Sequence, residues 1–313
     1  MFLLNVGILG TGFGYHHAVI YKQVAGIDSI TLFGRDRDKL KKIGEELDIQ
    51  TTDDIQEVLT NPNIDLIDVC LPSSLHRQYV VEALKNGKHV FCETPVALTL
   101  EDAALMLTAE KTYNKRVFVH QFIKHEMPNV YLFNVKQSGE LGRLKALHVK
   151  RTSPPLWGDL GLHNITTDLM IHDFDFITWL LGSPLQINAQ GINGRKGESH
   201  VQAALTYSDT IVSVEGSSMM PFAAPFTVEY EAVFEEGSIT YQEDSYQDTV
   251  VNSFKKYKDN KEEDIQITNK NCYEESLKHV LECCQTNAGT RLSLDAAIKS
   301  LEIAIRIKEQ VLS

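Results

Sequence analysis

Cysteine is scarce in this sequence, with five among 313 residues, and no two of them form a C-x-x-C pair. Cys283 and Cys284 are adjacent, so they cannot both ligate a metal with zinc-finger spacing. The sequence therefore predicts no metal site. It also predicts free thiols, which are typical of a reducing compartment, and we expect a cytoplasmic protein.

Positive charge is also in short supply. The 30 Lys and Arg residues are outnumbered by 42 Asp and Glu residues, which gives a net charge of −12, and no basic block stands out. This balance argues against a nucleic-acid partner, because nucleic-acid binding depends on clustered positive charge. A small-molecule substrate is the expected partner.

No apolar run is long enough to cross a membrane, which takes about 20 residues in a helix. The apolar start, Met1–Gly10, lacks a basic n-region and a cleavage site of the A-x-A kind. A buried β-strand explains this start better than a secretion signal does, and we expect no membrane partner.

Strands and helices alternate over residues 1–121. This alternation predicts right-handed crossovers and an α/β domain with a doubly wound parallel sheet. The expected strands are residues 2–9, 29–33, 64–71, 89–92 and 116–119, and the expected helices are residues 15–25, 36–47, 55–59, 74–86 and 100–111.

The pattern changes over residues 122–313, where strands separated by short turns predict an antiparallel meander within a second, α+β domain. The segment Lys255–Asp264 is highly charged and is expected to be an exposed loop. The expected strands are residues 143–152, 185–195, 199–207, 210–218, 227–234 and 238–242, and the expected helices are residues 126–137, 167–181, 272–286 and 293–311.

A glycine-rich turn follows the first predicted strand. Gly10 and Gly12 occupy the first two positions of G-x-G-x-x-G, whereas the third position falls on Tyr15, with Gly14 beside it. A strand before this turn and a helix after it favour dinucleotide binding over a purely structural turn. The residues expected to bind the pyrophosphate are Gly10, Thr11, Gly12, Phe13 and Gly14, while His16 and His17 are assigned to the first helix turn.

The end of the second strand bears on which dinucleotide is bound. An acidic residue there binds the ribose 2′-hydroxyl of NAD, whereas an arginine without such an acid suits the 2′-phosphate of NADP. Gly34 holds the acidic position and Arg35 follows, so we favour NADP. A shift of one residue would give Asp36 the acidic role and favour NAD. The remaining alternative is that Arg35 and Asp36 are simply solvated residues at a helix start.

Four segments together resemble the glucose–fructose oxidoreductase / inositol dehydrogenase / rhizopine catabolism (Gfo/Idh/MocA) family. They are Val6–Gly14 (V-G-I-L-G-T-G-F-G), Leu71–His76 (L-P-S-S-L-H), Gly87–Pro95 (G-K-H-V-F-C-E-T-P) and Asp168–Asp175 (D-L-M-I-H-D-F-D), the last followed by Trp179–Gly182. The resemblance covers nearly the whole chain.

The resemblance implies a Rossmann domain followed by an α+β domain with an open, mostly antiparallel sheet. It implies oxidation or reduction of sugars, polyols and related compounds with NAD or NADP, assembly as a homodimer or homotetramer, and a cis Thr94–Pro95 peptide. Glu93 would contact the nicotinamide ribose, and Asp168 and His172 would face the substrate. The residues that would line the ribose and nicotinamide side of the cofactor are Leu71, Pro72, Ser73, Ser74 and His76.

The chemistry of Asp168 and His172 can also be considered without the resemblance. They are four residues apart, so they share a face of the expected helix. Oxidation of an alcohol by hydride transfer needs a base for the hydroxyl proton, and histidine titrates near neutrality. The alternative is a hydrogen-bonded core histidine and an aspartate that belongs to the helix start.

Thr94 departs from the family pattern, which has lysine there. Loss of a cation beside a developing alkoxide could cost about 2–4 kcal/mol. Three interpretations follow: His172 transfers the proton alone, another group fills the gap, or the protein is no longer an ordinary dehydrogenase. The possible groups are His120, His163 and Lys124, and Trp157 could cover the site from a loop.

The sequence therefore leaves three hypotheses about function open. The first is an NAD(P)-dependent oxidoreductase with His172 as acid/base, Asp168 as its partner and Thr94 as a substrate hydrogen bond. The second is a dinucleotide-binding sensor that has lost catalysis. The third is a hydrolase or lyase that uses bound NAD in an oxidation–elimination cycle.

Overall fold

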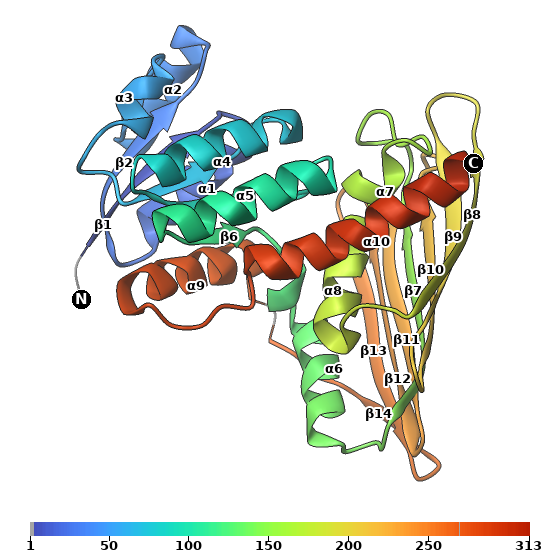
Figure 1. Ribbon diagram of the computed structural model, residues 1–313. Helices are drawn as coiled ribbons and strands as arrows, with labels where there is room; N and C mark the ends of the chain where they lie inside the picture. The colour runs from blue at the N-terminus through green and yellow to red at the C-terminus, as the bar shows by residue number, and fades with distance from the viewer. Residues whose placement is uncertain (1–2, 269) are drawn as a thin grey trace. The chain divides into compact units, whose positions relative to one another are not determined.

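The computed structural model describes residues 3–268 and 270–313, which divide into two compact units (Figure 1). The first unit comprises Met1–His125 and Lys270–Ile298, and the second comprises Glu126–Asn269 and Lys299–Ser313. The sequence-based division at residue 121 placed everything after it in the second domain. The structure differs because a segment near the C-terminus returns to the first unit.

The first unit contains a six-stranded parallel sheet with the order β3-β2-β1-β4-β5-β6. This order confirms the predicted doubly wound sheet, and it reverses direction between β1 and β4. The short strand β3 is the one that the sequence analysis did not expect. The strands are β1 (Leu4–Leu9), β2 (Ile27–Phe33), β3 (Gln50–Thr52), β4 (Leu66–Val69), β5 (His89–Cys92) and β6 (Val117–Val119).

Five helices of the first unit connect these strands, and side chains at their N-termini explain where three of them begin. Asp36, Asp54 and Thr99 each accept a hydrogen bond from a backbone N–H of the first helical turn. The helices are α1 (Phe13–Gln23), α2 (Arg37–Leu47), α3 (Ile55–Leu59), α4 (His76–Lys85) and α5 (Leu100–Tyr113).

Helix α9 (Cys272–Thr286) belongs to the first unit as well. Its buried residues Leu277, Val280 and Leu281 join the hydrophobic cluster of β1, β2 and α1. An amphipathic pattern shows that a helix has a buried face but not which sheet will cover it. The sequence therefore predicted α9 correctly as a helix while leaving its location open.

The second unit contains an eight-stranded sheet with the order β14-β13-β12-β11-β7-β10-β9-β8. Every pairing is antiparallel except that of β7 with β10, which confirms a mostly antiparallel sheet. The strands are β7 (Leu144–Thr152), β8 (Gln186–Asn193), β9 (Ser199–Thr206), β10 (Ile211–Ser217), β11 (Phe226–Phe234), β12 (Gly237–Ser245), β13 (Val250–Lys258) and β14 (Lys261–Asp264).

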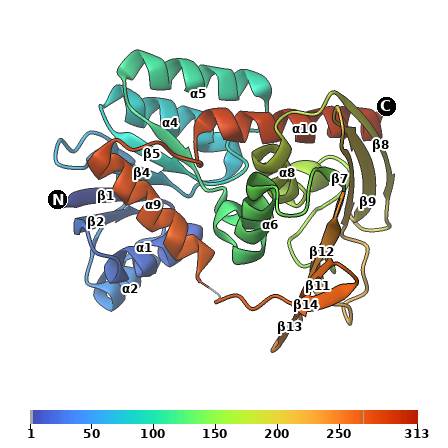
Figure 2. The same cartoon turned by 90° about the horizontal axis from the view of Figure 1, so that it is seen from below.

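Helices α6 (Met127–Ser138) and α8 (Ile171–Leu181) pack on one face of this sheet (Figure 2). Tyr230 of β11 contacts both of them, because its hydroxyl donates to the Pro128 carbonyl at 2.8 Å and its ring lies 5.9 Å from that of Phe176. The C-terminal part of α10 (Leu294–Leu312) follows β8, where the Gln310 side chain hydrogen-bonds the backbone of Ile187 and Ala189.

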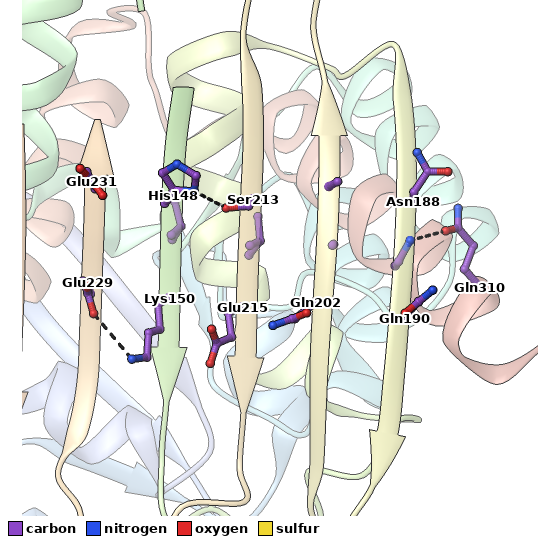
Figure 3. Close-up of a pocket in the computed structure, with 15 residues that line it drawn as sticks. His148, Lys150, Asn188, Gln190, Gln202, Ser213, Glu215, Glu229, Glu231 and Gln310 are labelled. Carbon is purple, nitrogen blue, oxygen red and sulfur yellow. Dashed lines mark hydrogen bonds and ion pairs between the residues drawn. The ribbon is translucent and has the colours of Figure 1, made fainter. Parts of the chain in front are cut away.

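Polar and charged side chains line the opposite face of the sheet. Figure 3 shows His148 and Lys150 on β7, Glu215 on β10 and Glu229 on β11 projecting from neighbouring strands. They border a hollow of about 710 Å³. An antiparallel sheet with one apolar and one polar face follows from alternating residues along each strand.

The prediction of a loop at Lys255–Asp264 was wrong, because this segment forms most of the hairpin β13–β14. Asp259 and Asn260 have positive φ angles of 52° and 57°, as a tight hairpin turn requires. Lys255 pairs across the strands with Glu262, and Lys256 pairs with Glu263. The high charge thus reflects an exposed hairpin whose opposite charges face one another, and not an unstructured loop.

The predicted helix 167–181 is interrupted. It forms α7 (Ile165–Asp168) and α8, with Leu169 and Met170 between them. Both intervening side chains are buried, and Met170 occupies the space that a side chain at Gly216 would need. Asp168 and His172 therefore do not lie on one continuous helix, which corrects the expectation drawn from their spacing.

Among the described residues, none of the helices combines the length and the apolar character that crossing a membrane would take.

Candidate functional site

The glycine turn after β1 lies at the point where the order of the parallel sheet reverses. Gly10 has a φ of +113°, and a side chain there would meet the Cys70 carbonyl oxygen at 2.5 Å. A side chain at Gly14 would meet Ile8 Cγ2 at 2.8 Å. Gly14 therefore provides the close contact of helix and strand that the motif usually assigns to its third glycine, and Tyr15 does not need to.

Gly12 differs from its neighbours because nothing lies within 4 Å of the position that a side chain would take. It precedes the first residue of α1, so backbone N–H groups at the start of this helix are available to an anion. Thr11 is half-buried and Phe13 is exposed. The turn thus fits a pyrophosphate, which needs bare backbone and open space at a helix N-terminus.

The end of β2 supplies the next part of the site. A side chain at Gly34 would meet Thr11 Cγ2 at 2.5 Å, so this position is closed to an acidic residue in the present backbone. Asp36 caps α2 by accepting a hydrogen bond from the Lys39 N–H at 3.0 Å. Arg35 is exposed. A hollow of about 460 Å³ lies nearby, lined by Thr11, Gly12, Phe13, Tyr15, His16, Lys39 and Ile43.

The loop after β4 runs through the predicted cofactor residues and ends in a short 3-10 helix at Ser73–Leu75. Pro72 and Ser74 are exposed, whereas Leu71 and Ser73 are half-buried. His76 is buried, and its ring nitrogens lie 2.8 Å from the Leu71 carbonyl oxygen and 3.0 Å from that of Pro95. The imidazole connects two loops, and burial lowers its pKa.

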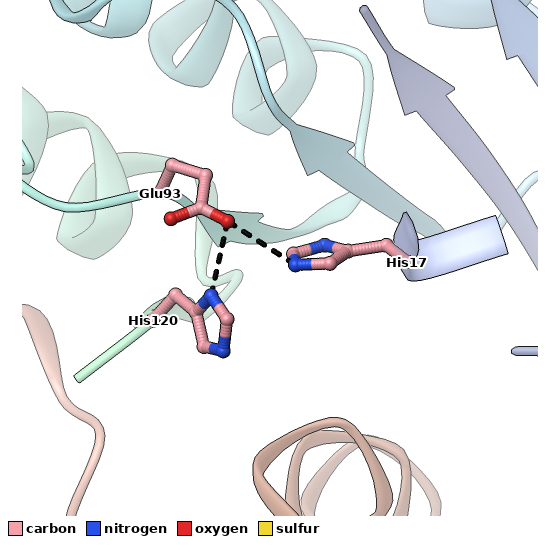
Figure 4. A group of neighbouring side chains, drawn as sticks. All are labelled: His17, Glu93 and His120. Atoms are coloured by element: carbon pink, nitrogen blue, oxygen red, sulfur yellow. Dashed lines mark hydrogen bonds and ion pairs between the residues drawn. The ribbon is translucent and has the colours of Figure 1, made fainter. Parts of the chain in front are cut away.

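Glu93 follows β5 and is held by two histidines (Figure 4). Its Oε1 lies 3.1 Å from His17 Nε2 and 3.0 Å from His120 Nδ1. Burial alone would raise the pKa of the Glu93 carboxyl, but the imidazoles of His120 and His17 bring this pKa well below its usual range. Glu93 is therefore an anion at neutral pH. His120, a predicted substrate residue, is fully buried behind it.

Sequence analysis missed the role of His17. Gly14, His17, Ala18 and Tyr21 are the buried residues of α1, and they follow the i, i+3, i+4, i+7 spacing of a buried helix face. A histidine on such a face needs a buried polar partner. This spacing was the available signal, although it could not identify Asp68 and Glu93 as the partners.

Thr94 follows Glu93, and its peptide bond to Pro95 is cis, as the resemblance implied. Its N–H donates to Glu93 Oε2 at 3.3 Å. Lys124, a possible substitute for the missing lysine, is buried with its ammonium donating to Gln121 Oε1 at 2.7 Å and to the Arg291 carbonyl at 3.1 Å. Its charge is thus already engaged within the first unit.

The second unit carries the remaining predicted residues. Asp168 is exposed at the end of α7 and accepts a hydrogen bond from the Thr167 hydroxyl at 2.8 Å, and His172 is half-buried in the first turn of α8. Next to His172, Asp173 forms a buried ion pair with Arg151 at 2.8 Å. The Asp173 carboxylate therefore belongs to the core and not to a surface.

His163 and Trp157 lie on the loop that precedes α7, and both are exposed. The Trp157 ring packs edge-on against Phe226 at 4.9 Å while 53% of the residue stays accessible. It is thus anchored at one edge and open at the other.

Models of one protein family match both units. The oxidoreductase family with an NAD-binding Rossmann fold matches residues 4–121, and the GFO/IDH/MocA C-terminal domain matches residues 132–240. The chain belongs to the GFO/IDH/MocA family. It is therefore an NAD(P)-dependent oxidoreductase, and its glycine turn is part of the family's NAD-binding domain.

Curated relatives and solved structures agree with the GFO/IDH/MocA assignment. The scyllo-inositol 2-dehydrogenase (NAD(+)) of Bacillus subtilis is 27% identical over 96% of this chain and 92% of its own length. The inositol 2-dehydrogenase of Pseudomonas savastanoi pv. phaseolicola is 28% identical, over 57% of this chain and 54% of its own. The fold matches UDP-N-acetylglucosamine 3-dehydrogenase GnnA from Acidithiobacillus ferrooxidans with a TM-score of 0.83 at 18% identity, covering 99% of this chain and 98% of that one.

In the part of the chain that the structure describes, two overlapping groups of side chains bring nitrogen, oxygen or sulfur atoms within 4.8 Å of one another. One comprises His17, Glu93 and His120, and the other comprises His17, Asp68 and Cys70. Such spacing would also suit a metal ion, although the sequence predicted none. All five cysteines are free.

Replacing Gly12 with alanine tests the pyrophosphate site. The new methyl group meets open space, so we expect Gly12→Ala to cost about 1 kcal/mol of stability or less. It would, however, occupy the room needed by the pyrophosphate, and we expect calorimetry to show NADP⁺ binding weakened by about tenfold or more.

Gly289→Ala is the matched control, because position 289 is equally open. It should change neither stability nor binding. Nucleotide binding by Gly12→Ala at the strength of the parent protein would contradict the assignment of this turn.

Proposed function

We propose that the chain is a dehydrogenase that transfers a hydride between a nicotinamide dinucleotide and a CH–OH or C=O group of a sugar, a polyol or a related compound. One observation carries the proposal. The fitted glycine turn and the Glu93 anion lie at the carboxyl ends of β1 and β5 of one doubly wound sheet. The full-length likeness to a scyllo-inositol 2-dehydrogenase supports the substrate class.

The proposed binding roles follow from the first unit. The backbone of Gly10–Gly14 would bind the pyrophosphate, and Glu93 would accept a hydrogen bond from a hydroxyl of the nicotinamide ribose. The ribose and nicotinamide side would be lined by Leu71, Pro72, Ser73 and Ser74. The buried His76 imidazole connects their loop to the loop that carries Pro95. The bound dinucleotide supplies the hydride acceptor or donor.

The residues proposed for proton transfer lie in the second unit. His172 would hold the proton that leaves the substrate hydroxyl, and Asp168 would stabilise the charged imidazole. Because α7 ends at Asp168 and α8 starts after it, this pair depends on the break between the helices and not on a shared helix face. Thr94 would offer a neutral hydrogen bond in place of the usual lysine, and His120, His163 and Trp157 remain lesser candidates for substrate contact.

Absorbance of reduced nicotinamide, followed across a panel of sugars and polyols, tests this function against the alternatives. We expect net oxidation or reduction of the cofactor. Product formation without such change would indicate an NAD-assisted hydrolase or lyase, and binding without chemistry would indicate a sensor. The comparisons support neither alternative.

Removing the imidazole of His172 should stop turnover in the same assay. We expect His172→Ala to lower kcat by about 10²–10⁴-fold, the usual contribution of a general base, with the Kd for the cofactor within about twofold of the parent value. His172→Gln is the matched variant, because it keeps hydrogen bonding but cannot titrate. Activity near the parent level in either variant would exclude His172 as the base.

We also propose that NADP is preferred over NAD. Gly34 leaves no acid at the usual ribose position, Asp36 is engaged in capping α2, and Arg35 is exposed for a 2′-phosphate. Lys39, in the neighbouring hollow, would add positive charge.

Arg35→Ala tests this preference. We expect it to weaken NADPH binding by about tenfold or more, because a charge-assisted contact to phosphate is lost, and to leave NADH binding nearly unchanged. Arg37→Ala is the control, since that guanidinium already pairs with Asp53. An equal loss for both nucleotides would refute the preference.

We propose that the chain forms a homodimer or homotetramer through the polar face of the second sheet, opposite α6 and α8, and acts in the cytoplasm, where its thiols would stay free. Sedimentation should then give two or four times the chain mass of 35.2 kDa. A stable monomer at micromolar concentration would contradict this assembly.

A further inference from the structure

Four side chains, three of them fully buried, form a continuous chain of polar contacts beneath the nucleotide turn. Asp68 Oδ2 lies 2.9 Å from His17 Nδ1, and His17 Nε2 lies 3.1 Å from Glu93 Oε1. The same oxygen of Glu93 accepts the contact of His120 Nδ1 at 3.0 Å (Figure 4). The chain Asp68–His17–Glu93–His120 thus links β4, α1 and the ends of β5 and β6.

Aromatic rings pack against two histidines of this chain. Phe91 stacks on His17 at 5.8 Å, and Tyr273 of α9 lies edge-on to His120 at 4.6 Å. The side chains of His17, Asp68 and His120 are fully buried, whereas Glu93 keeps 14% of its side chain exposed. Glu93 is therefore the one of these four side chains that reaches the surface.

The protonation of His17 follows from its two neighbours. Each ring nitrogen faces a carboxylate oxygen, so each is best occupied by a proton. Burial alone would lower the pKa of His17, but Asp68 and Cys70 raise it well above the ordinary value. The titratable groups around His17 are Tyr21 of α1, Asp68 of β4, Cys70 after β4, Glu93 after β5, His120 after β6 and Tyr273 of α9.

The same contacts fix the orientation of the Glu93 carboxylate. Oε1 is held by two imidazoles, while among residues 3–268 and 270–313 the one polar contact of Oε2 is the long bond from the Thr94 N–H at 3.3 Å. Oε2 therefore retains capacity to accept a hydrogen bond from a ligand hydroxyl.

We propose that Asp68, His17 and His120 are positioning residues that hold Glu93 as an anion and reserve its Oε2 for a hydroxyl of the nicotinamide ribose. This inference rests on the proposed function, because it takes the ligand to be a nicotinamide dinucleotide. Asp68 acts on the cofactor only through the His17 imidazolium.

A metal ion is the alternative occupant of His17, Glu93 and His120. It would need the nitrogen of His17 that faces Glu93 to be free of its proton. The carboxylates on both sides of the ring favour the imidazolium instead. We therefore infer that both ring nitrogens of His17 carry protons and that no metal ion is bound there.

The test uses Asp68→Asn, which keeps the shape of the side chain and removes its charge. Without that charge, the pKa of His17 should fall, so the imidazolium is lost as the pH rises. We expect the ratio of NADP⁺ dissociation constants, variant over parent, to increase with pH between about 5.5 and 8.5 and to reach about tenfold. A purely structural defect would weaken binding equally at every pH.

Asp65→Asn is the matched control, because Asp65 lies just before the opposite end of β4 and bonds the Asn5 N–H at 2.9 Å. It should leave both affinity and pH profile unchanged. A ratio for Asp68→Asn that is flat with pH, or equal to one throughout, overturns the proposal.

Nitrogen NMR of histidine-labelled parent protein gives a second readout that needs no variant to fold. His17 should remain doubly protonated at pH 7.5, with no stoichiometric metal found by elemental analysis. A neutral His17 ring, or one equivalent of zinc whose removal alters the His17 signal, would also overturn the proposal.

These outcomes separate this inference from the proposed function. If the parent binds neither nucleotide, the proposed function fails and the ribose part of the inference fails with it, even with His17 charged. If the parent binds NADP⁺ and only the pH-dependent ratio is absent, the positioning role alone is wrong.

Discussion

The close approach of β1, α1 and β4 at two glycines, Gly10 and Gly14, is the constraint on which the first unit depends. A side chain at Gly10 would strike the Cys70 carbonyl, and one at Gly14 would strike Ile8. The turn between Gly10 and Gly14 can therefore keep its backbone N–H groups at the surface only because neither residue has a side chain. Gly12 then faces open space, where a ligand can approach its backbone.

The electrostatics of the site follow from the same packing. By bringing α1 close to β4, the glycines place His17 between Asp68 and Glu93. A carboxylate with a mostly buried side chain would ordinarily take up a proton, yet the surrounding imidazoles keep Glu93 charged. The backbone geometry of the turn and the charge of Glu93 at the end of β5 thus both follow from the packing of α1 against β4. Helix α9, far along the chain, adds Tyr273, whose ring packs edge-on against His120.

Sequence predicted what depends on local patterns and on recognisable motifs. The parallel sheet, the mostly antiparallel sheet, the turn at Gly10–Gly14 and the cis peptide before Pro95 were all anticipated. It failed where distant contacts decide. The charge of Lys255–Asp264 suggested a loop, whereas opposite charges pair across a hairpin there. The predicted helix also breaks after Asp168, where the buried Met170 packs against Gly216. The partners of His17 lie 51 and 76 residues away, beyond any spacing rule.

A crystal structure of the protein with NADP⁺ tests the central claim most directly. The account predicts the pyrophosphate over Gly12, against the backbone N–H groups at the start of α1, and a ribose hydroxyl within hydrogen-bonding distance of Glu93 Oε2. A dinucleotide bound away from the Gly10–Gly14 turn, or one that leaves Glu93 without contact, would contradict it.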